Sequence, residues 1–254
     1  MNISFSEVCD IGLKAAENQD AVLCAMREEA GLFAVADGMG GHDGGAFASK
    51  TVLESLGAWW KQYTDTTVLV DGYQSNIDGI GEAAGNANKI IRESVGRGTV
   101  CGSTLVALWL DGSQYAVISC GDSRCYRVTQ KFLSTSIECL TKDDVWQNKP
   151  SNVAGLSSEQ IRSHRNYGKL LRAVGTEQSF SYSVNGGDIT RDTLFVLCSD
   201  GVFKYLDRSV FEKCLKNAFY GGDLNKSANE LKQQVYKNGA PDNLSVVLVK
   251  VDVT

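Results

Sequence analysis

Prolines, histidines and long apolar runs are scarce in this chain of 254 residues, and it carries no excess of positive charge. With only two prolines and no low-complexity tract, no linker is evident, so we expect a single domain over residues 1–254. The apolar runs stay under about ten residues, far short of the roughly 20 that a membrane-spanning helix needs. The formal charge of −5 provides no basic surface for nucleic acid. A membrane protein and a nucleic-acid-binding protein are therefore not expected.

The two histidines and eight cysteines do not form a zinc pattern, because no close pair of cysteines has zinc spacing. Most cysteines lie in apolar, strand-like runs (Cys120 and Cys198, for example), which favours buried reduced thiols over disulfides. The N-terminus lacks the basic and apolar regions of a signal peptide. We therefore expect a cytoplasmic protein.

The apolar pattern predicts groups of strands separated by pairs of helices. Helical spacing predicts helices over 44–63, 77–95, 207–219 and 224–237. Strands are expected over 3–9, 21–27, 32–36, 103–110, 114–120, 124–129, 193–198 and 244–251. Asp111-Gly112 is a hairpin signal between two of them. Hairpins and paired helices together indicate an α+β fold, with mostly antiparallel sheets covered by helices.

One long polar stretch, residues 143–168, interrupts this pattern, and we call it the flap. It contains Pro150, Gly155 and a helix-start signal near Ser157. An irregular excursion of this length in a compact domain is usually functional or mobile.

The stretch from Leu32 to Gly45 carries the strongest functional signal. Five apolar or small residues end at Asp37, and five glycines follow within eight positions. An Asp-Gly turn is the ordinary explanation for one such acid. Apolar runs end in an acid twice more, however, at Asp122 and at Asp200.

Two further acids lie next to predicted strands. Asp20 precedes a strand and Asp242 lies in a turn before the last strand, and singly each is explained as a turn or cap residue. Four or five acids at strand ends, without intervening basic residues, would repel each other unless cations neutralise them. Carboxylate oxygens suit Mg²⁺ or Mn²⁺, and two such ions can lower the pKa of a water held between them. We interpret the acids as a site for hydrolysing a phosphate ester.

Eight short motifs lie in order along nearly the whole chain. They are Asn18-Gln19-Asp20, Val35-Ala36-Asp37-Gly38-Met39-Gly40-Gly41-His42, Gly102-Ser103-Thr104-Leu105, Gly121-Asp122-Ser123-Arg124, Leu140-Thr141-Lys142-Asp143-Asp144, Arg172-Ala173-Val174-Gly175, Ser199-Asp200-Gly201 and Asp242-Asn243-Leu244-Ser245. In this order they resemble the motifs of the metal-dependent serine/threonine protein phosphatases, the type 2C class. The Asp-Gly-Met-Gly-Gly form resembles the bacterial branch.

The resemblance implies a four-layer α-β-β-α sandwich in which helices flank two mostly antiparallel sheets. It implies a protein phosphatase that hydrolyses phosphoserine and phosphothreonine by in-line attack of a water bridging two Mn²⁺ or Mg²⁺ ions, with no phosphoenzyme. Phosphorylated proteins are the implied partners, with a cognate serine/threonine kinase, and we expect a monomer. The flap matches the variable segment beside the active site of this family.

The resemblance also assigns roles to the acids. Asp37 would bridge two metals, the Gly38 carbonyl would bind one of them, and Asp200 and Asp242 would hold the other. Asp20 would lie beside the metals, directly or through water. The complete set of implied metal ligands, including a looser third-metal site at Asp122 and Asp200, is Asp20, Asp37, Gly38, Asp122, Asp200 and Asp242.

One departure concerns the substrate phosphate. The family usually has an arginine five residues before the position of Asp20, where it contacts phosphate, and this chain has Ala15. Loss of a bidentate donor should weaken substrate binding. Lys14 is adjacent, but on a strand it would point elsewhere. The candidate replacements are Arg172 and the flap residues Arg162, His164 and Arg165.

Two alternative functions stay open. The first alternative, which Ala15 suggests, is a weakly active or inactive phosphatase-like module that binds or regulates a partner. A metal hydrolase for a small phosphate ester is the other. His42 does not decide between them: eukaryotic relatives have a histidine directly after Asp-Gly, where this chain has Met39, and we interpret His42 as ordering the glycine turn.

Overall fold

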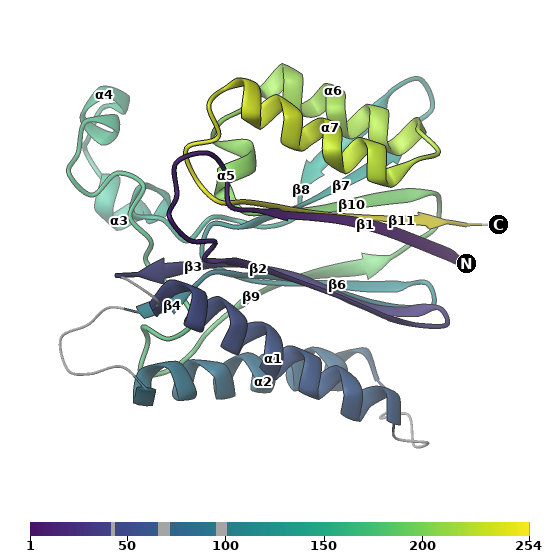
Figure 1. The fold of residues 1–254 in the computed structure, drawn as a ribbon, viewed down its shortest axis with the longest axis horizontal. Helices are drawn as coiled ribbons and strands as arrows, with labels where there is room; N and C mark the ends of the chain where they lie inside the picture. The colour runs from purple at the N-terminus through teal and green to yellow at the C-terminus, as the bar shows by residue number, and fades with distance from the viewer. Residues whose placement is uncertain (42–43, 66–71, 95–100, 254) are drawn as a thin grey trace.

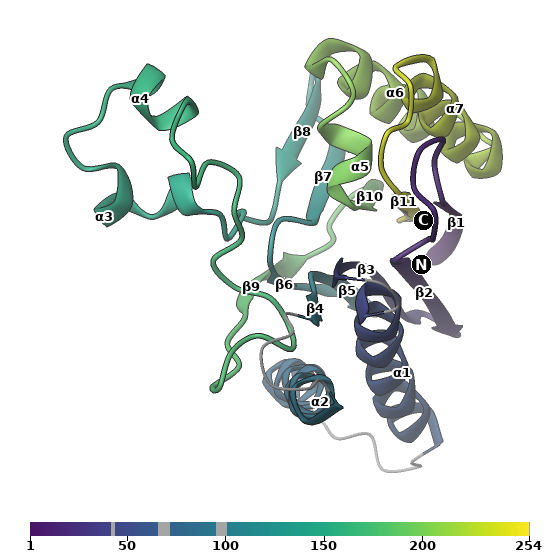
Figure 2. The same ribbon diagram turned by 60° about the vertical axis from the view of Figure 1, so that its left-hand side comes forward.

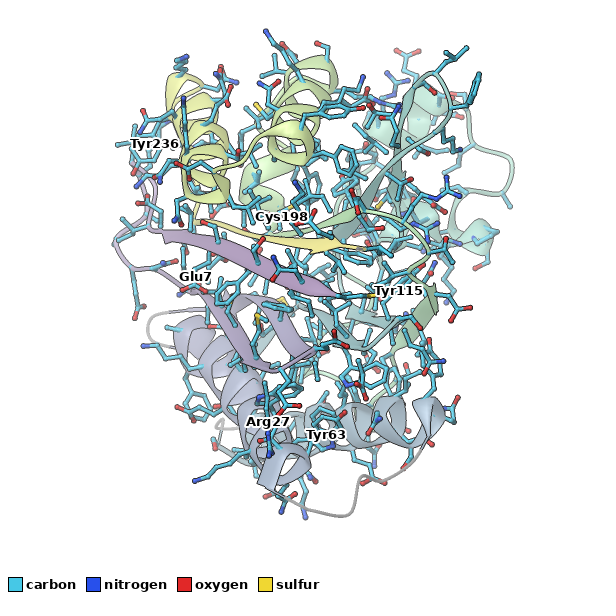
Figure 3. The ribbon with its side chains drawn as sticks, turned by 90° about the vertical axis from the view of Figure 1, so that its right-hand side faces the viewer. Glu7, Arg27, Tyr63, Tyr115, Cys198 and Tyr236 are labelled. Atoms are coloured by element: carbon cyan, nitrogen blue, oxygen red, sulfur yellow. The ribbon has the colours of Figure 1, made fainter. Side chains whose placement is uncertain are left out.

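The computed structural model describes residues 1–41, 44–65, 72–94 and 101–253. Two β-sheets pack face to face, and helices cover the outer face of each (Figure 1). The predicted four-layer α-β-β-α sandwich is therefore confirmed. In Figure 3 the outer layers are marked by Tyr236 on one helical layer and Tyr63 on the other, with the two sheets between them.

The pairings between the described strands are all antiparallel. The first sheet has the order β1 (Asn2–Asp10), β11 (Leu244–Asp252), β10 (Thr193–Cys198), β7 (Arg124–Gln130) and β8 (Thr135–Cys139). The second sheet has the order β2 (Asp20–Arg27), β3 (Ala30–Gly40), β5 (Leu105–Asp111), β6 (Gln114–Cys120) and β9 (Ser183–Asp188), and the short β4 (Cys101–Ser103) pairs with the end of β3.

The long helices lie where the apolar periodicity predicted them. Helices α1 (Gly44–Asp65) and α2 (Tyr73–Ser94) cover the second sheet, and α6 (Arg208–Tyr220) and α7 (Leu224–Lys237) cover the first (Figure 1). The flap holds a 3₁₀ turn, η1 (Trp146–Asn148), and two short helices, α3 (Pro150–Val153) and α4 (Ser158–Arg162), which project from the body of the molecule (Figure 2). Among the described helices, none has the length and apolar character needed to cross a bilayer.

Strand alternation builds the layers and also aims the acids. On β3, Ala34 and Ala36 pack toward the helices, whereas Phe33 and Val35 pack between the two sheets. Because successive side chains on a strand point to opposite faces, Asp37 continues the row that faces the other sheet. The acid therefore stands at the end of the buried layer between the sheets.

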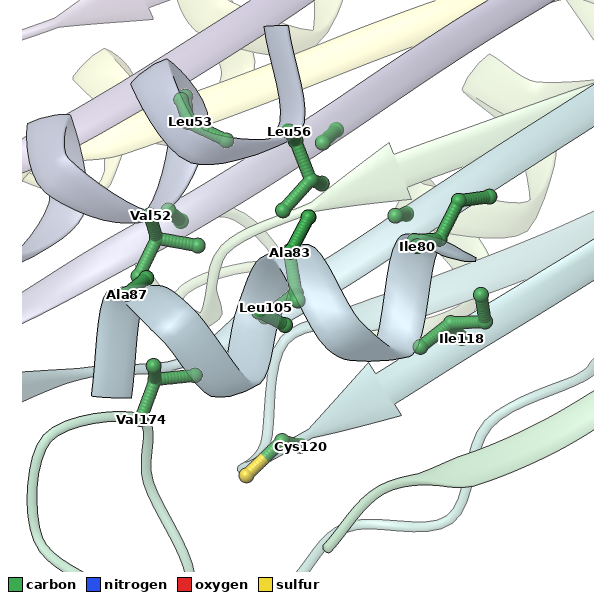
Figure 4. Packing of buried hydrophobic residues seen from close by; sticks show 14 of the residues in the cluster. Val52, Leu53, Leu56, Ile80, Ala83, Ala87, Leu105, Ile118, Cys120 and Val174 are labelled. Carbon is green, nitrogen blue, oxygen red and sulfur yellow. The ribbon is translucent and has the colours of Figure 1, made fainter. Parts of the chain in front are cut away.

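The layer between α1, α2 and the second sheet is closely packed (Figure 4). Val52 and Leu56 of α1 and Ile80 of α2 lie over Leu105 and Ile118 of the sheet, and all five are fully buried. Burial of one such side chain contributes roughly 2 kcal/mol to folding. This packing fixes the position of β3, on which Asp37 lies.

The structure corrects the expected turn at Asp37. Strand β3 does not end at Ala36 but continues through Asp37 to Gly40, because Gly38–Gly40 pairs with β4. The strand expected over 103–110 is divided at Thr104 into β4 and β5. The first two glycines after the acid, Gly38 and Gly40, thus extend the sheet rather than turn the chain.

Outside the flap, three of the described elements escaped the sequence analysis. Strand β9 is Ser-Val-Asn-Gly-Gly-Asp, with a single apolar residue, and it forms only because β6 offers a free edge. Strand β8 is an edge strand with little burial. Helix α5 (Asp200–Phe203) is one turn long, too short to show a period.

Candidate metal centre

Strands β2 and β3 bring the first two acids together. Asp20 and Asp37 are directly opposite each other in the antiparallel register. Both lie on the face that points between the sheets, since Val22 and Val35 on the same faces join the core there. Asp20 is only 5% exposed, so its charge is largely shielded from water.

The first sheet supplies the next two acids from the ends of β10 and β11. The Ser199 hydroxyl donates to Asp20 Oδ2 over 2.7 Å, which places the following residue, Asp200, next to Asp20. The Gln19 N–H donates to the side-chain oxygen of Asn243 over 2.8 Å, which brings Asp242 to the same place. Both links cross from one sheet to the other, so the site lies at the shared edge of the sandwich.

Asp122 joins the cluster through Thr104. The Asp37 N–H donates to Thr104 Oγ1 over 3.0 Å, and Thr104 N–H donates to the Asp37 carbonyl over 2.8 Å. The same Thr104 hydroxyl lies 2.7 Å from the hydroxyl of Ser123, the neighbour of Asp122. Asp122 is 4% exposed and forms an ion pair with Lys204, whose ammonium also contacts Asp200. The five acids therefore form one connected group.

The lysine corrects one premise of the sequence analysis. The acids were expected to lack basic neighbours, but Lys204 lies among them. Burial lowers the pKa of Lys204, yet attraction by Asp200 and Asp122 outweighs it and raises the pKa overall. Lys204 therefore stays charged. Among the described residues, it is the one ammonium group that contacts any of the five carboxylates.

Four of the five acids have pKa values above the ordinary value for aspartate. Burial is the largest cause that raises the pKa of Asp37 far above its ordinary value, and repulsion by Asp20 and Asp200 adds to it. Burial also raises the pKa of Asp20 to about 7, against the opposing hydrogen bond from Ser199. The pKa values of Asp122 and Asp242 are raised by burial as well. An added cation would relieve this charge repulsion.

These shifts predict that the metal-free fold loses stability as pH rises. Asp20 has a pKa of 3.8 when unfolded and about 7 when folded, so its contribution falls between about pH 4 and pH 7. From pH 5 to pH 8, metal-free wild type should lose roughly 2–3 kcal/mol of unfolding free energy more than Asp20→Asn. Urea denaturation at both pH values measures this difference.

Asparagine makes a close control there, because its side-chain oxygen can still accept from Ser199. Saturating Mn²⁺ should flatten the pH dependence of the wild type. Equal pH dependence in metal-free wild type and Asp20→Asn would show that Asp20 is not the titrating group.

The cluster fits divalent cations in donor chemistry and charge. Mg²⁺ and Mn²⁺ prefer carboxylate and carbonyl oxygens, and Mg²⁺ keeps several waters in its shell. Among the described residues, no three His, Cys, Asp or Glu side chains converge closely enough to enclose an ion as they stand. The residues therefore fit ions that are held by few protein oxygens each and completed by water.

Gly38 is positioned to lend its carbonyl. A Cβ on Gly38 would lie 2.1 Å from the Gly45 carbonyl oxygen, so no larger residue fits. The Gly38 N–H donates to the Gln19 carbonyl over 3.1 Å, and the carbonyl of a strand residue points to the same edge as its N–H. The Gly38 carbonyl therefore points past the start of β2, where Asp20 lies.

Two of the four candidate phosphate contacts have other partners. Arg172 donates to Asp144 Oδ1 over 2.8 Å and to the Ser183 hydroxyl over 2.9 Å, so it anchors the flap to β9. His164 stacks on Trp146 within the flap, with ring centroids 4.0 Å apart. Arg162 and Arg165 lie in the flap as well, and both are exposed.

Ala15 is half-buried in the loop between β1 and β2. Asn243 holds this loop by donating to the carbonyls of Ile11 and Glu17 over 2.9 and 3.0 Å. The prediction that Lys14 lies on a strand is wrong, since Lys14 lies in a turn of this loop and is exposed. His42 lies outside the described residues.

The sequence analysis did not identify three residues that position the acids. Thr104 and Asn243 stand within quoted motifs, but their hydrogen bonds between distant segments are not visible in a sequence. Lys204 left one usable signal, its spacing of four residues from Asp200, which places both on one face of a helical turn.

Comparison with known proteins gives a consistent result. The family model for protein phosphatase 2C matches residues 14–236. The serine/threonine protein phosphatase PstP of Mycobacterium tuberculosis is 27% identical over 242 residues, which is 95% of this chain and 44% of PstP. The chain thus spans less than half the length of that relative.

Solved structures extend the match to the whole fold. PppA of Pseudomonas aeruginosa, described as a key regulatory component of T6SS, is 27% identical with a TM-score of 0.78, covering 98% of this chain and 97% of PppA. The catalytic domain of a PstP, solved in complex with two manganese ions, has a TM-score of 0.77 at 23% identity, covering 98% and 99%. At that identity the second match speaks for the fold alone.

Proposed function

This chain belongs to the protein phosphatase 2C family, and on that premise we propose that it is a metal-dependent enzyme that removes phosphate from phosphoserine and phosphothreonine in proteins. We propose that residues 1–254 act as one catalytic domain. The observation that carries the proposal is the group of five carboxylates at the shared edge of the two sheets. Their mutual repulsion calls for bound cations, and oxygen donors favour Mn²⁺ or Mg²⁺. The PstP catalytic domain, which shares this fold, is described in complex with two manganese ions.

Each proposed ligand has a defined role in holding the ions. Asp37 lies centrally, opposite Asp20 and joined through Thr104 to the segment that carries Asp122, so we assign it contact with both ions. The Gly38 carbonyl would hold one ion, and Asp200 and Asp242 would hold the other. Asp20, which accepts from Ser199, would act beside the ions, directly or through water.

When bound, a pair of such ions supplies a nucleophilic water at neutral pH and neutralises the negative charge on phosphate. The protein itself supplies position. Thr104 accepts from and donates to the Asp37 backbone, and the Ser199 hydroxyl donates to the Asp20 carboxylate; these hydrogen bonds fix both acids, so little rearrangement remains for the reaction. No nucleophilic side chain is required in this scheme.

Phosphate release from a phosphothreonine peptide tests the proposal directly. The protein is stripped of metal and assayed with Mn²⁺, with Mg²⁺ and with chelator, beside p-nitrophenyl phosphate. We expect turnover with added metal, none with chelator, and a preference for the peptide. Efficient hydrolysis of small esters alone would favour the small-ester hydrolase, and metal binding without turnover would favour the regulatory module.

The missing arginine gives a second prediction. Ala15 lies in the loop that Asn243 holds beside the acids. Ala15→Arg should add a bidentate phosphate donor and raise kcat/KM for phosphopeptide roughly 10-fold, about 1.4 kcal/mol. Steady-state kinetics on the Mn²⁺-loaded enzyme measures it.

Ala16→Arg is a matched control, because it adds the same charge one residue further along an exposed part of the same loop. An equal gain in both variants would indicate general electrostatic attraction. No gain at Ala15, beside good wild-type activity, would mean that another residue already binds the phosphate.

A further inference from the structure

Lys204 forms a built-in cationic bridge between two of the acids. Its ammonium lies 3.1 Å from Asp122 Oδ2 and also contacts Asp200 Oδ2. Its backbone N–H donates to the Asp200 carbonyl over 3.0 Å, so the turn of α5 holds the lysine close to its partner. The bridge thus connects α5, which follows β10, to the turn between β6 and β7, where Asp122 lies.

The position of this bridge matters because of which acids it joins. Asp122 and Asp200 are the two residues that the family resemblance assigned to a third, looser metal site. The side chains of these acids are only 6% and 18% exposed, so their charges are poorly screened by solvent. One oxygen of each acid, Oδ2, already contacts the ammonium.

A divalent ion and the ammonium exclude each other at this place. Two cations within a few ångströms repel each other strongly, because the effective dielectric of a protein surface is well below that of water. To admit an ion between Asp122 and Asp200, Lys204 would have to swing into solvent and give up both ion pairs. Its side chain is 44% exposed, so this motion is sterically open but electrostatically opposed.

We propose that the Lys204 ammonium takes the place of a third metal ion, so that this enzyme holds two divalent ions and not three. The inference rests on the proposed function, since it presumes the pair of ions at Asp37. Lys204 is then a positioning residue. It neutralises Asp122, and through Asp200 Oδ2 it orients a carboxylate that would hold a metal together with Asp242.

A tethered charge differs from an ion in one testable respect. An ion in a weak site is lost at low metal concentration, whereas a side chain is always present. The enzyme should therefore need no additional, weakly bound metal once the first two sites are filled.

The test counts Mn²⁺ bound per chain by equilibrium dialysis with elemental analysis, at free Mn²⁺ from micromolar to about 5 mM. Wild type should saturate at two ions. Lys204→Gln, which removes the charge and leaves both carboxylates, should bind a third ion with lower affinity, and Lys204→Asp, which adds a carboxylate, should bind it more tightly. Far-UV circular dichroism checks that each variant is folded.

Lys89→Gln is the matched control. Lys89 also has a carboxylate four residues along its helix, with Nζ 3.9 Å from Glu93, but it lies on the exposed side of α2. This variant should bind two ions. Three ions in wild type, or only two in both Lys204 variants, would overturn the inference. No bound Mn²⁺ in wild type would instead overturn the proposed function.

Discussion

Replacing Asp37 by asparagine should lower kcat/KM for phosphopeptide hydrolysis by at least about 10³-fold, roughly 4 kcal/mol of transition-state stabilisation. Asp37 is the acid most affected by the others, since Asp20, Asp200, Asp122 and Asp242 all raise its pKa after burial does. A carboxylate in contact with two ions provides charge that an amide cannot. The same variant should lose Mn²⁺ affinity at both sites, which isothermal titration calorimetry measures independently of turnover.

Asp111→Asn is the matched control for this experiment. Asp111 is the last residue of β5, at the end of that strand opposite to Thr104 and the acids, where it accepts a 2.8 Å hydrogen bond from the Tyr63 hydroxyl. It should keep near wild-type kcat/KM and metal affinity. If Asp37→Asn retained more than a tenth of the wild-type kcat/KM, the assignment of Asp37 as the shared ligand would be wrong.

Asp37 also illustrates how far the sequence could predict the fold. Long helices and buried strands were found because their apolar residues recur with a clear period, as on α7 (Leu224–Lys237), whose bounds match the expectation. The layer order followed from family resemblance and is confirmed by the structure. What failed was the turn at Asp37, because Gly38–Gly40 forms a strand only by pairing with a distant segment, β4.

The candidate site shows the same division. The five acids could be picked out because each stands where an apolar run begins or ends. Their grouping could not be derived from local pattern, because it depends on contacts such as Ser199 to Asp20 between residues far apart in the chain. Lys204 was missed for the same reason: a lysine near a surface turn is ordinary until the fold places Asp122 against it.

The second large effect concerns a glycine, Gly201, which follows Asp200 in α5. A Cβ at this position would lie 1.8 Å from the Asn243 carbonyl oxygen and 3.4 Å from the Leu244 Cα. Both are backbone atoms and cannot rotate away, so Gly201→Ala must push α5 from the start of β11. We expect a loss of at least about 3 kcal/mol of unfolding free energy, at the upper end for overpacking.

The same displacement should separate Asp200 from Asp242, so the Gly201→Ala protein that remains folded should bind Mn²⁺ at least about tenfold more weakly. Urea denaturation and calorimetric titration give the two quantities. Gly85→Ala on α2 is the control, because its Cβ would meet only Phe180 at 3.9 Å. In a helix that change usually stabilises by up to about 1 kcal/mol. If Gly201→Ala lowers the unfolding free energy and Gly85→Ala raises it, helix propensity cannot explain both changes. The close approach of two backbone segments at Gly201 would then be what fixes the distance between Asp200 and Asp242. If the Gly201→Ala variant kept the stability and the Mn²⁺ affinity of the wild type, this role of Gly201 would be refuted.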